Sequence, residues 1–281
     1  MNLYHFQNRA WFVARQVRAA AKPETTRTAE HWLLSPSGAR LYCRVHHSTT
    51  CEQPTPAVLI VPGLGCTGTA LEEFSEPINV QELTNIGVTV MTIDLSGRGQ
   101  SDGEDTYGGP EQQNDVLTAL QHLVAMPEIN PERVAVISLS LGCAAVSGAL
   151  ANEAAPNLCW WLDWEGPCDR EIITSSGKIM VPAMGHTLED DDYWYPREAV
   201  RQIAKIKTPY IRYQSIRDHA QPGELRHASR MITAASAADL PWYQLNSHAR
   251  NMNPAKPHWG PMGYRAARDF IVETTRLLLS K

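Results

Sequence analysis

The most constraining feature of the chain is the segment at residues 131–150, PERVAVISLSLGCAAVSGAL. Its apolar first part predicts a buried strand at 133–138, and the small residues after Leu141 predict a helix that packs closely on a sheet. Ser140 lies in the sharp turn between them. A serine at a strand-to-helix turn is typical of a nucleophile elbow, in which the hydroxyl is exposed above the sheet beside the N–H groups of a helix start.

Ser138, two residues before Ser140, replaces the glycine that this turn usually has. Because the serine adds a Cβ and a hydroxyl, we expect the turn to be slightly displaced but intact. An alternative interpretation is a plain strand–helix junction in which Ser140 is the N-cap, since serine is a favoured cap residue. The other motifs of the chain favour the elbow.

Apolar strands and helical patterns alternate along most of the chain. The turn-prone residues 35–38 join the first two strands, which we expect to be antiparallel. Continuously apolar strands separated by helices predict an α/β fold, with a mostly parallel sheet of about eight strands and helices on both faces. The predicted strands are 30–34, 39–46, 57–61, 88–93, 134–138, 159–163, 210–214 and 242–245, and the predicted helices are 110–124, 141–155, 196–206, 224–238 and 264–279.

We divide the chain into an N-terminal helical extension at 1–29 and one α/β domain at 30–281. Arginines interrupt the first segment too often for the apolar core of a signal peptide, so we expect it to pack on the domain or to join two copies as a homodimer. The insertion at 166–195 is predicted to form a small lid.

Composition excludes some classes of function. The net charge of −5 gives no basic footprint for nucleic acid. No segment has the unbroken apolar length of a membrane span. The six cysteines have no zinc-ligand spacing, so we predict free thiols, no metal and a cytoplasmic location. They are Cys43, Cys51, Cys66, Cys143, Cys159 and Cys168.

Two further motifs follow strands at the same edge of the predicted sheet. The first, at 62–65, reads PGLG, and its tight turn can direct the N–H of Leu64 at a developing oxyanion together with the N–H of Leu141. The second, DLSGRGQSDG from Asp94, has the glycines of a tight loop, and we expect Asp94 and Arg98 to hydrogen-bond neighbouring backbone.

A carboxylate is needed to orient a catalytic histidine and to stabilise the imidazolium ion. Asp218 follows the strand at 210–214 and is the predicted acid, because it comes after Ser140 and before the late histidines. Asp163 and Glu165 at the end of another strand are rival acids, or they line the substrate pocket.

The base is predicted among histidines that follow the last strand. We favour His248, two residues past the expected strand end, and keep His258 as the alternative. Neither has a preceding glycine, and we expect His219 to point away from the site.

In this order, the elbow, the PGLG loop, the DLSGRGQSDG loop, an acid and a late histidine resemble the α/β-hydrolase superfamily from about residue 30 onward. The segments at 35–45, 56–65 and 127–142 are similar to the dienelactone-hydrolase, acylaminoacyl-peptidase and serine-aminopeptidase branches. The resemblance implies an α/β-hydrolase fold with Ser140 as nucleophile, Asp218 as acid, and Leu64 and Leu141 as oxyanion donors.

The predicted function is a cofactor-free serine hydrolase that cleaves an ester, thioester, lactone or small amide through an acyl-enzyme. Trp164, Glu165 and Trp194 are predicted pocket residues for a small acyl substrate. Two alternatives stay open: acyl transfer by the same residues, and a scaffold protein that keeps the fold without turnover.

Overall fold

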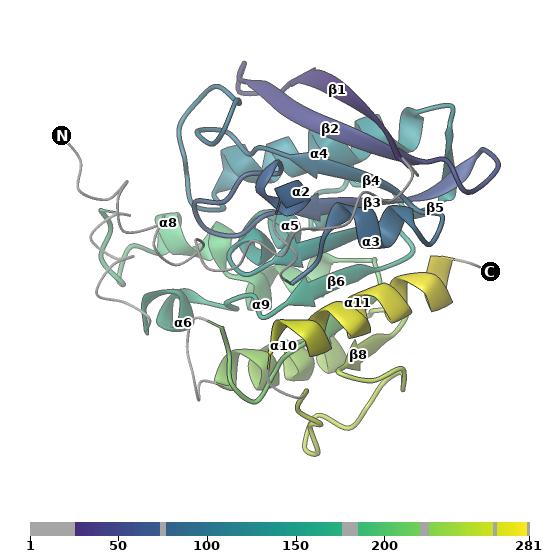
Figure 1. Ribbon diagram of the computed structural model, residues 1–281. Helices are drawn as coiled ribbons and strands as arrows, with labels where there is room; N and C mark the ends of the chain where they lie inside the picture. Colours follow the sequence, from purple (N-terminus) through teal and green to yellow (C-terminus); the bar gives the residue numbers. More distant parts are fainter. Residues whose placement is uncertain (1–25, 74–76, 176–184, 220–224, 261–262, 280–281) are drawn as a thin grey trace.

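The computed structural model describes residues 26–73, 77–175, 185–219, 225–260 and 263–279. Their core is one eight-stranded sheet with the strand order β1-β2-β4-β3-β5-β6-β7-β8 (Figure 1). β1 is antiparallel to β2 and β2 to β4, and every other pair is parallel. The strands are β1 Thr26–Leu34, β2 Arg40–Ser48, β3 Thr55–Val61, β4 Thr89–Ile93, β5 Ile129–Leu139, β6 Trp161–Trp164, β7 Tyr210–Tyr213 and β8 Tyr243–Leu245.

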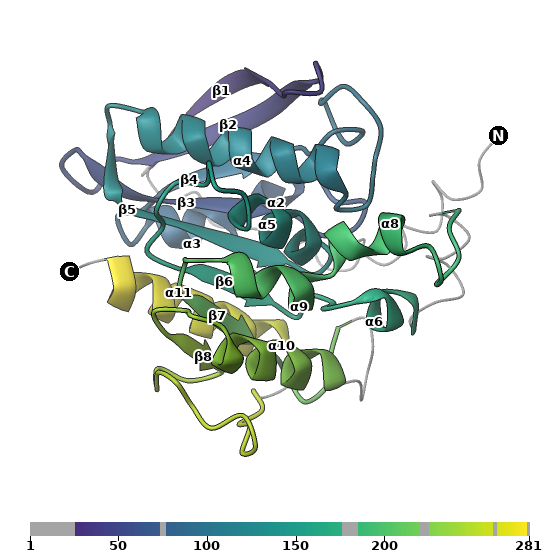
Figure 2. The same ribbon diagram turned by 180° about the vertical axis from the view of Figure 1, so that it is seen from behind.

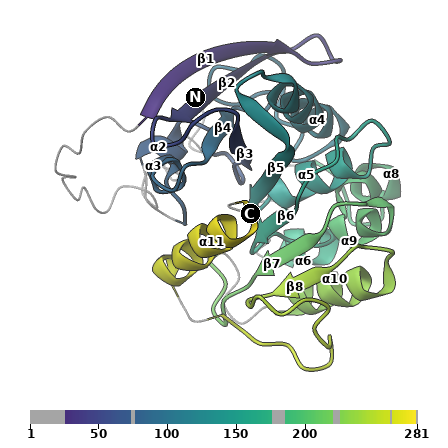
Figure 3. The same ribbon diagram turned by 90° about the vertical axis from the view of Figure 1, so that its right-hand side faces the viewer.

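Helices cover both faces of the sheet, and Figure 3 shows the two layers on either side of the strands. One face carries α4 (Pro110–Ala125), α5 (Gly142–Leu150), α9 (Ala199–Gln202) and α10 (Arg226–Ala237), which lie in front in Figure 2. The other carries α2 (Ala70–Glu73), α3 (Val80–Thr84) and α11 (Tyr264–Leu279). Each layer has its own buried apolar cluster, because continuously apolar strands contribute side chains to both faces.

The predicted fold class is confirmed, and all eight predicted strands are present. The helix predicted at 196–206 is instead divided into η1 (Tyr195–Arg197), α9 and η2 (Ile203–Lys205). Residues 26–29, assigned above to a helical extension, belong to β1, where they pair with β2. Residues 1–25 lie outside the described residues, so the extension and the homodimer stay predictions. The described part of the lid segment contains two short helices, α6 (Arg170–Ser175) and α8 (Asp191–Trp194).

All six cysteines are free, as predicted. None of the helices in the described ranges combines the length and the apolar character that crossing a bilayer requires.

Candidate active site

Ser140 sits at the predicted turn between β5 and α5, in a left-handed backbone conformation with φ of +50°. This conformation is strained for a residue with a side chain and is typical of functional positions. The Ser140 N–H donates to the carbonyl of Trp164 at 2.9 Å, which fixes the turn to the end of β6. Gly142 has no room for a side chain, since a Cβ there would lie 2.7 Å from the Val61 oxygen.

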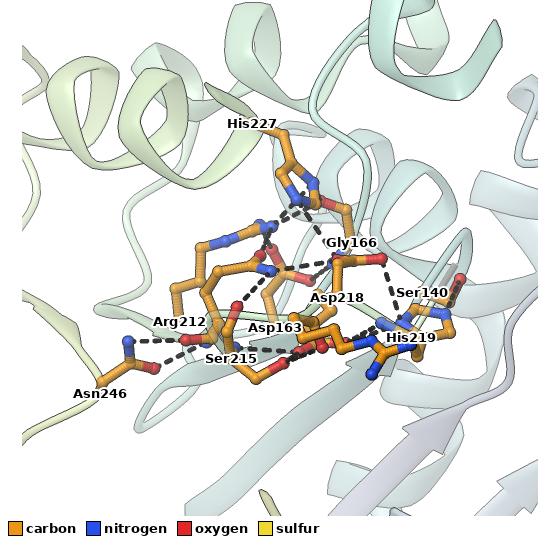
Figure 4. Close-up of polar contacts among 12 residues, drawn as sticks. Ser140, Asp163, Gly166, Arg212, Ser215, Asp218, His219, His227 and Asn246 are labelled. Atoms are coloured by element: carbon orange, nitrogen blue, oxygen red, sulfur yellow. Dashed lines mark hydrogen bonds and ion pairs between the residues drawn. The ribbon is translucent and has the colours of Figure 1, made fainter. Parts of the chain in front are cut away.

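His219 provides the imidazole at Ser140. Its Nε2 lies 3.1 Å from Ser140 Oγ (Figure 4). Its Nδ1 lies 2.8 Å from Glu165 Oε2. Glu165 is acceptor-only when ionised, so the tautomer that satisfies both contacts has the proton on Nδ1. Nε2 is then free to accept the Ser140 hydroxyl proton.

Glu165 is fixed from several directions. It follows β6 with φ of +49°, and its N–H donates to the Tyr213 carbonyl at 3.0 Å. Oε1 accepts hydrogen bonds from the backbone N–H and the hydroxyl of Ser215, while Oε2 also accepts the backbone N–H of His219 at 2.9 Å. The carboxylate is buried and therefore has one orientation toward the imidazole.

Strand register brings Glu165 and His219 together. β6 and β7 are parallel, with Trp164 opposite Tyr213, so the residues just beyond the two strands meet at one edge. Trp164 also stacks on the His219 ring, with centroids 4.3 Å apart and planes inclined by 27°. The imidazole is thus held by a carboxylate at its edge and by an indole on its face.

Asp218, the predicted acid, is not the nearest carboxylate to the imidazole. Its Oδ1 lies 3.7 Å from His219 Nδ1, almost 1 Å farther than Glu165. Asp218 Oδ2 instead accepts a hydrogen bond from Gln214 at 3.1 Å and lies 3.4 Å from Nε2 of His227. Although burial acts to raise the pKa of Asp218, the contacts with His227 and His219 hold it below its usual range.

The predicted bases also lie elsewhere: the histidine at Ser140 is neither His248 nor His258. After β8, Asn246 exchanges hydrogen bonds with the Gln214 backbone and donates to the His258 carbonyl. The loop then turns back, and the exposed His248 ring stacks on Phe270 of α11.

The expectation that His219 points away from the site is wrong, since its Nε2 lies 3.1 Å from Ser140 Oγ. It followed from looking for the base only after the last strand. The available signal was position: His219 follows β7, and the rival acid Glu165 follows the adjacent β6. Considering both residues as neighbours at one sheet edge would have paired them.

The segments that hold the predicted oxyanion donors lie beside Ser140. A Cβ added to Gly63 would lie 3.0 Å from Ser140 Cβ, so the PGLG loop is packed directly against the turn. No backbone carbonyl of the described residues accepts a hydrogen bond from the N–H of Leu64 or Leu141. Two amide donors beside Ser140 therefore remain available for a ligand oxygen.

A buried polar network lies beneath the site. Asp163, the second rival acid, forms an ion pair with Arg212 in which both side chains are fully buried. Tyr210 donates to the same carboxylate at 2.8 Å, and Arg212 donates to the Gly166 carbonyl at 2.8 Å. Asp163 is thus committed to Arg212 and its neighbours. In Figure 4, Arg212 lies on the side of Asp218 away from Ser140.

The contacts of Ser138 explain why a serine replaces the usual glycine at this position. The residue is completely buried, and its hydroxyl accepts a hydrogen bond from the Trp161 indole at 2.8 Å. The side chain gives a buried N–H a partner, which a glycine could not do.

Apolar and aromatic side chains form a wall beside the turn. Trp194, a predicted pocket residue, is buried in this wall, whereas Trp164 packs on His219 and Glu165 binds it. Ile173 and Tyr193 come from the lid segment. The wall consists of Leu64, Tyr107, Leu141, Ala144, Ile173, Tyr193 and Trp194.

Glu165, Asp218 and His219 also have the chemistry of a metal site, with ligand atoms within 4.8 Å of one another. In the structure His219 Nδ1 and Glu165 Oε2 are already bound to each other. A cation would have to replace that hydrogen bond, so the contacts favour an acid–base pair.

No protein-family model matches the chain, and no curated protein matches its sequence. Solved structures do match its fold. An esterase from Pyrococcus furiosus is 16% identical with a TM-score of 0.61, over 82% of this chain and 87% of the esterase. Acetyl xylan esterase 1 from Thermoanaerobacterium sp. is 13% identical with a TM-score of 0.64, over 92% and 86%.

A puromycin-hydrolyzing peptidase from Mycobacterium tuberculosis is 14% identical with a TM-score of 0.66. The match covers 92% of this chain but only 39% of the peptidase. These proteins are similar to this chain in overall fold while differing from it in sequence at most positions. The chain therefore has the α/β-hydrolase fold.

Proposed function

We propose that this chain is a serine hydrolase in which Ser140 is the nucleophile, His219 the general base and Glu165 the acid that orients it. The observation that carries the proposal is the continuous hydrogen-bonded path from Ser140 Oγ through both ring nitrogens of His219 to Glu165. Nucleophile, base and orienting acid within hydrogen-bond reach are the requirements of this chemistry.

In the first half-reaction, Ser140 Oγ bonds to the substrate carbonyl carbon and its proton moves to His219 Nε2. The carbonyl electron pair moves to the oxygen, which the N–H groups of Leu64 and Leu141 would stabilise. The bond to the leaving group then breaks, and the leaving group takes the proton from Nε2. Water repeats these steps on the acyl-enzyme, which releases the acid and restores Ser140.

The substrate we propose is a small ester, thioester, lactone or amide with an apolar acyl group. The partly exposed members of this wall, Leu64, Tyr107 and Tyr193, support apolar recognition next to the turn. The fold relatives include esterases and a peptidase, which supports hydrolysis over a scaffold role. Acyl transfer uses the same residues with another acceptor, and the six free thiols suit the cytoplasm as the location.

Labelling with a fluorophosphonate probe, followed by mass spectrometry of the labelled peptide, tests the proposal. We expect one adduct, on Ser140, and hydrolysis of short-chain p-nitrophenyl esters. Ser140→Ala should lose both signals while melting at the wild-type temperature. A folded wild-type protein that neither reacts with the probe nor cleaves any of a panel of esters, thioesters, lactones and amides would refute a hydrolase.

A further inference from the structure

Arg98 is a buried cation outside the path from Ser140 to Glu165. It lies in the turn after β4, between two glycines with positive φ, Gly97 at +77° and Gly99 at +55°. A Cβ on Gly97 would overlap the backbone of Asp105, so the turn is pressed against this residue. The local backbone thus directs the arginine side chain inward, where it is 4% exposed.

The guanidinium makes three hydrogen bonds. Nε and Nη2 donate to the two oxygens of Asp105 at 2.8 and 3.0 Å, in the fork geometry that fixes a planar arginine. Nη1 donates to the Gly63 carbonyl at 2.6 Å. Asp105 is itself held by the side chain of Gln112 at 3.0 Å and by the backbone N–H of Tyr107 at 2.9 Å.

The Gly63 carbonyl belongs to the same peptide unit as the N–H of Leu64. In a planar trans peptide these two groups point in opposite directions, so a bond that fixes the carbonyl also fixes the N–H. A charged donor on the oxygen polarises the amide as well, and hydrogen bonds in such a chain strengthen one another. The peptide abuts Ser140, as the 3.0 Å approach of a Cβ on Gly63 to Ser140 Cβ demonstrates.

We propose that Arg98 is a positioning residue for the oxyanion site: it anchors and polarises the Gly63–Leu64 peptide so that the Leu64 N–H points at the oxygen formed by attack of Ser140. This inference rests on the proposed hydrolase function. Asp105 orients Arg98 and takes no part in the reaction. Because the effect is exerted on the transition-state oxygen, it acts on kcat more than on KM.

The experiment compares the wild type with Arg98→Lys and with the double variant Arg98→Met/Asp105→Asn, which removes both charges of the buried pair. Arg40→Met is the matched control, since Arg40 also pairs with an aspartate at 2.9 Å but is largely exposed. We expect kcat to fall by about 100-fold in the double variant, which is the order of the loss seen when an oxyanion donor is removed outright. In Arg98→Lys we expect kcat to fall by about tenfold. KM and the acidic limb of the pH profile should stay near wild type.

A trifluoromethyl ketone adduct supplies a readout that a merely structural role would not move. Its hemiketal oxygen occupies the oxyanion position, and ¹⁹F NMR reports its pKa, which we expect to rise by about one unit in both Arg98 variants. If the folded Arg98 variants have the wild-type kcat and the wild-type hemiketal pKa, the inference about Arg98 is overturned. The hydrolase proposal still stands in that case, provided that the wild type is active and labelled at Ser140. An inactive wild type, unlabelled at Ser140, would overturn both.

Discussion

The end of β5 and the ends of β6 and β7 contribute to the same site in different ways. At β5, one short segment provides the strand, the turn and the helix start, and Ser140 takes its position from its own left-handed backbone. At β6 and β7, two segments separated by a long stretch of chain meet through parallel pairing. There, Glu165 and His219 are positioned by hydrogen bonds to each other's region of the chain.

This difference shows which parts of a site are local and which are tertiary. The nucleophile region depends on backbone geometry, so substitutions that add atoms near Gly142 disturb it. The acid–base region depends on which of two carboxylates is nearer the imidazole, 2.8 Å for Glu165 against 3.7 Å for Asp218. Exchanging one carboxylate at a time separates their contributions.

The largest expected effect in the acid–base region comes from Glu165→Gln. The amide has the size of the carboxylate but no negative charge to stabilise the His219 imidazolium, so kcat should fall by about a thousandfold. Steady-state hydrolysis of an ester cleaved by the wild type provides the measurement. The matched control is Asp218→Asn, for which we expect kcat within about tenfold of wild type because its carboxylate is farther from Nδ1. A reversal of the two effects would assign the acid to Asp218.

A smaller effect, on stability, is expected from Asp218→Asn. Its pKa is lowered in the folded state, so its ionised form stabilises the protein above the unfolded pKa of about 3.9, and this contribution is lost as the pH falls toward the folded value. The variant should lose about 2 kcal/mol of unfolding free energy at pH 7. Urea unfolding at several pH values should show that the difference in unfolding free energy between the variant and the wild type becomes smaller below about pH 4. A difference independent of pH would contradict an electrostatic role.

The sequence was sufficient for the eight strands and for the turn at Ser140. Strand and helix periodicity predicted the layers, and the small residues around Ser140 predicted the turn, because both signals are local. The break at Glu198 and the short segments around it depend on tertiary contacts, including the Glu198–Arg170 ion pair, that periodicity does not contain.

The base that we propose, His219, could not be predicted by counting from the last strand. Asn246 binds the loop after β8 to the Gln214 backbone, and farther along this loop His248 stacks on Phe270. No local sequence pattern predicts the path of this loop. Glu165 was recognised as a candidate, but the choice between it and Asp218 depends on a difference of about 1 Å in the distance from each carboxylate to His219 Nδ1. Such distances depend on the register of the parallel strands β6 and β7.

The most direct test of the Ser140–His219–Glu165 arrangement is the rate of fluorophosphonate labelling at Ser140 in His219→Ala, compared with His248→Ala and His258→Ala. We expect labelling of His219→Ala to be slower by about a thousandfold or more, since the serine loses its base, and the other two variants to react at the wild-type rate. If His219→Ala is labelled at the wild-type rate while His248→Ala or His258→Ala is not labelled, the result would contradict the arrangement.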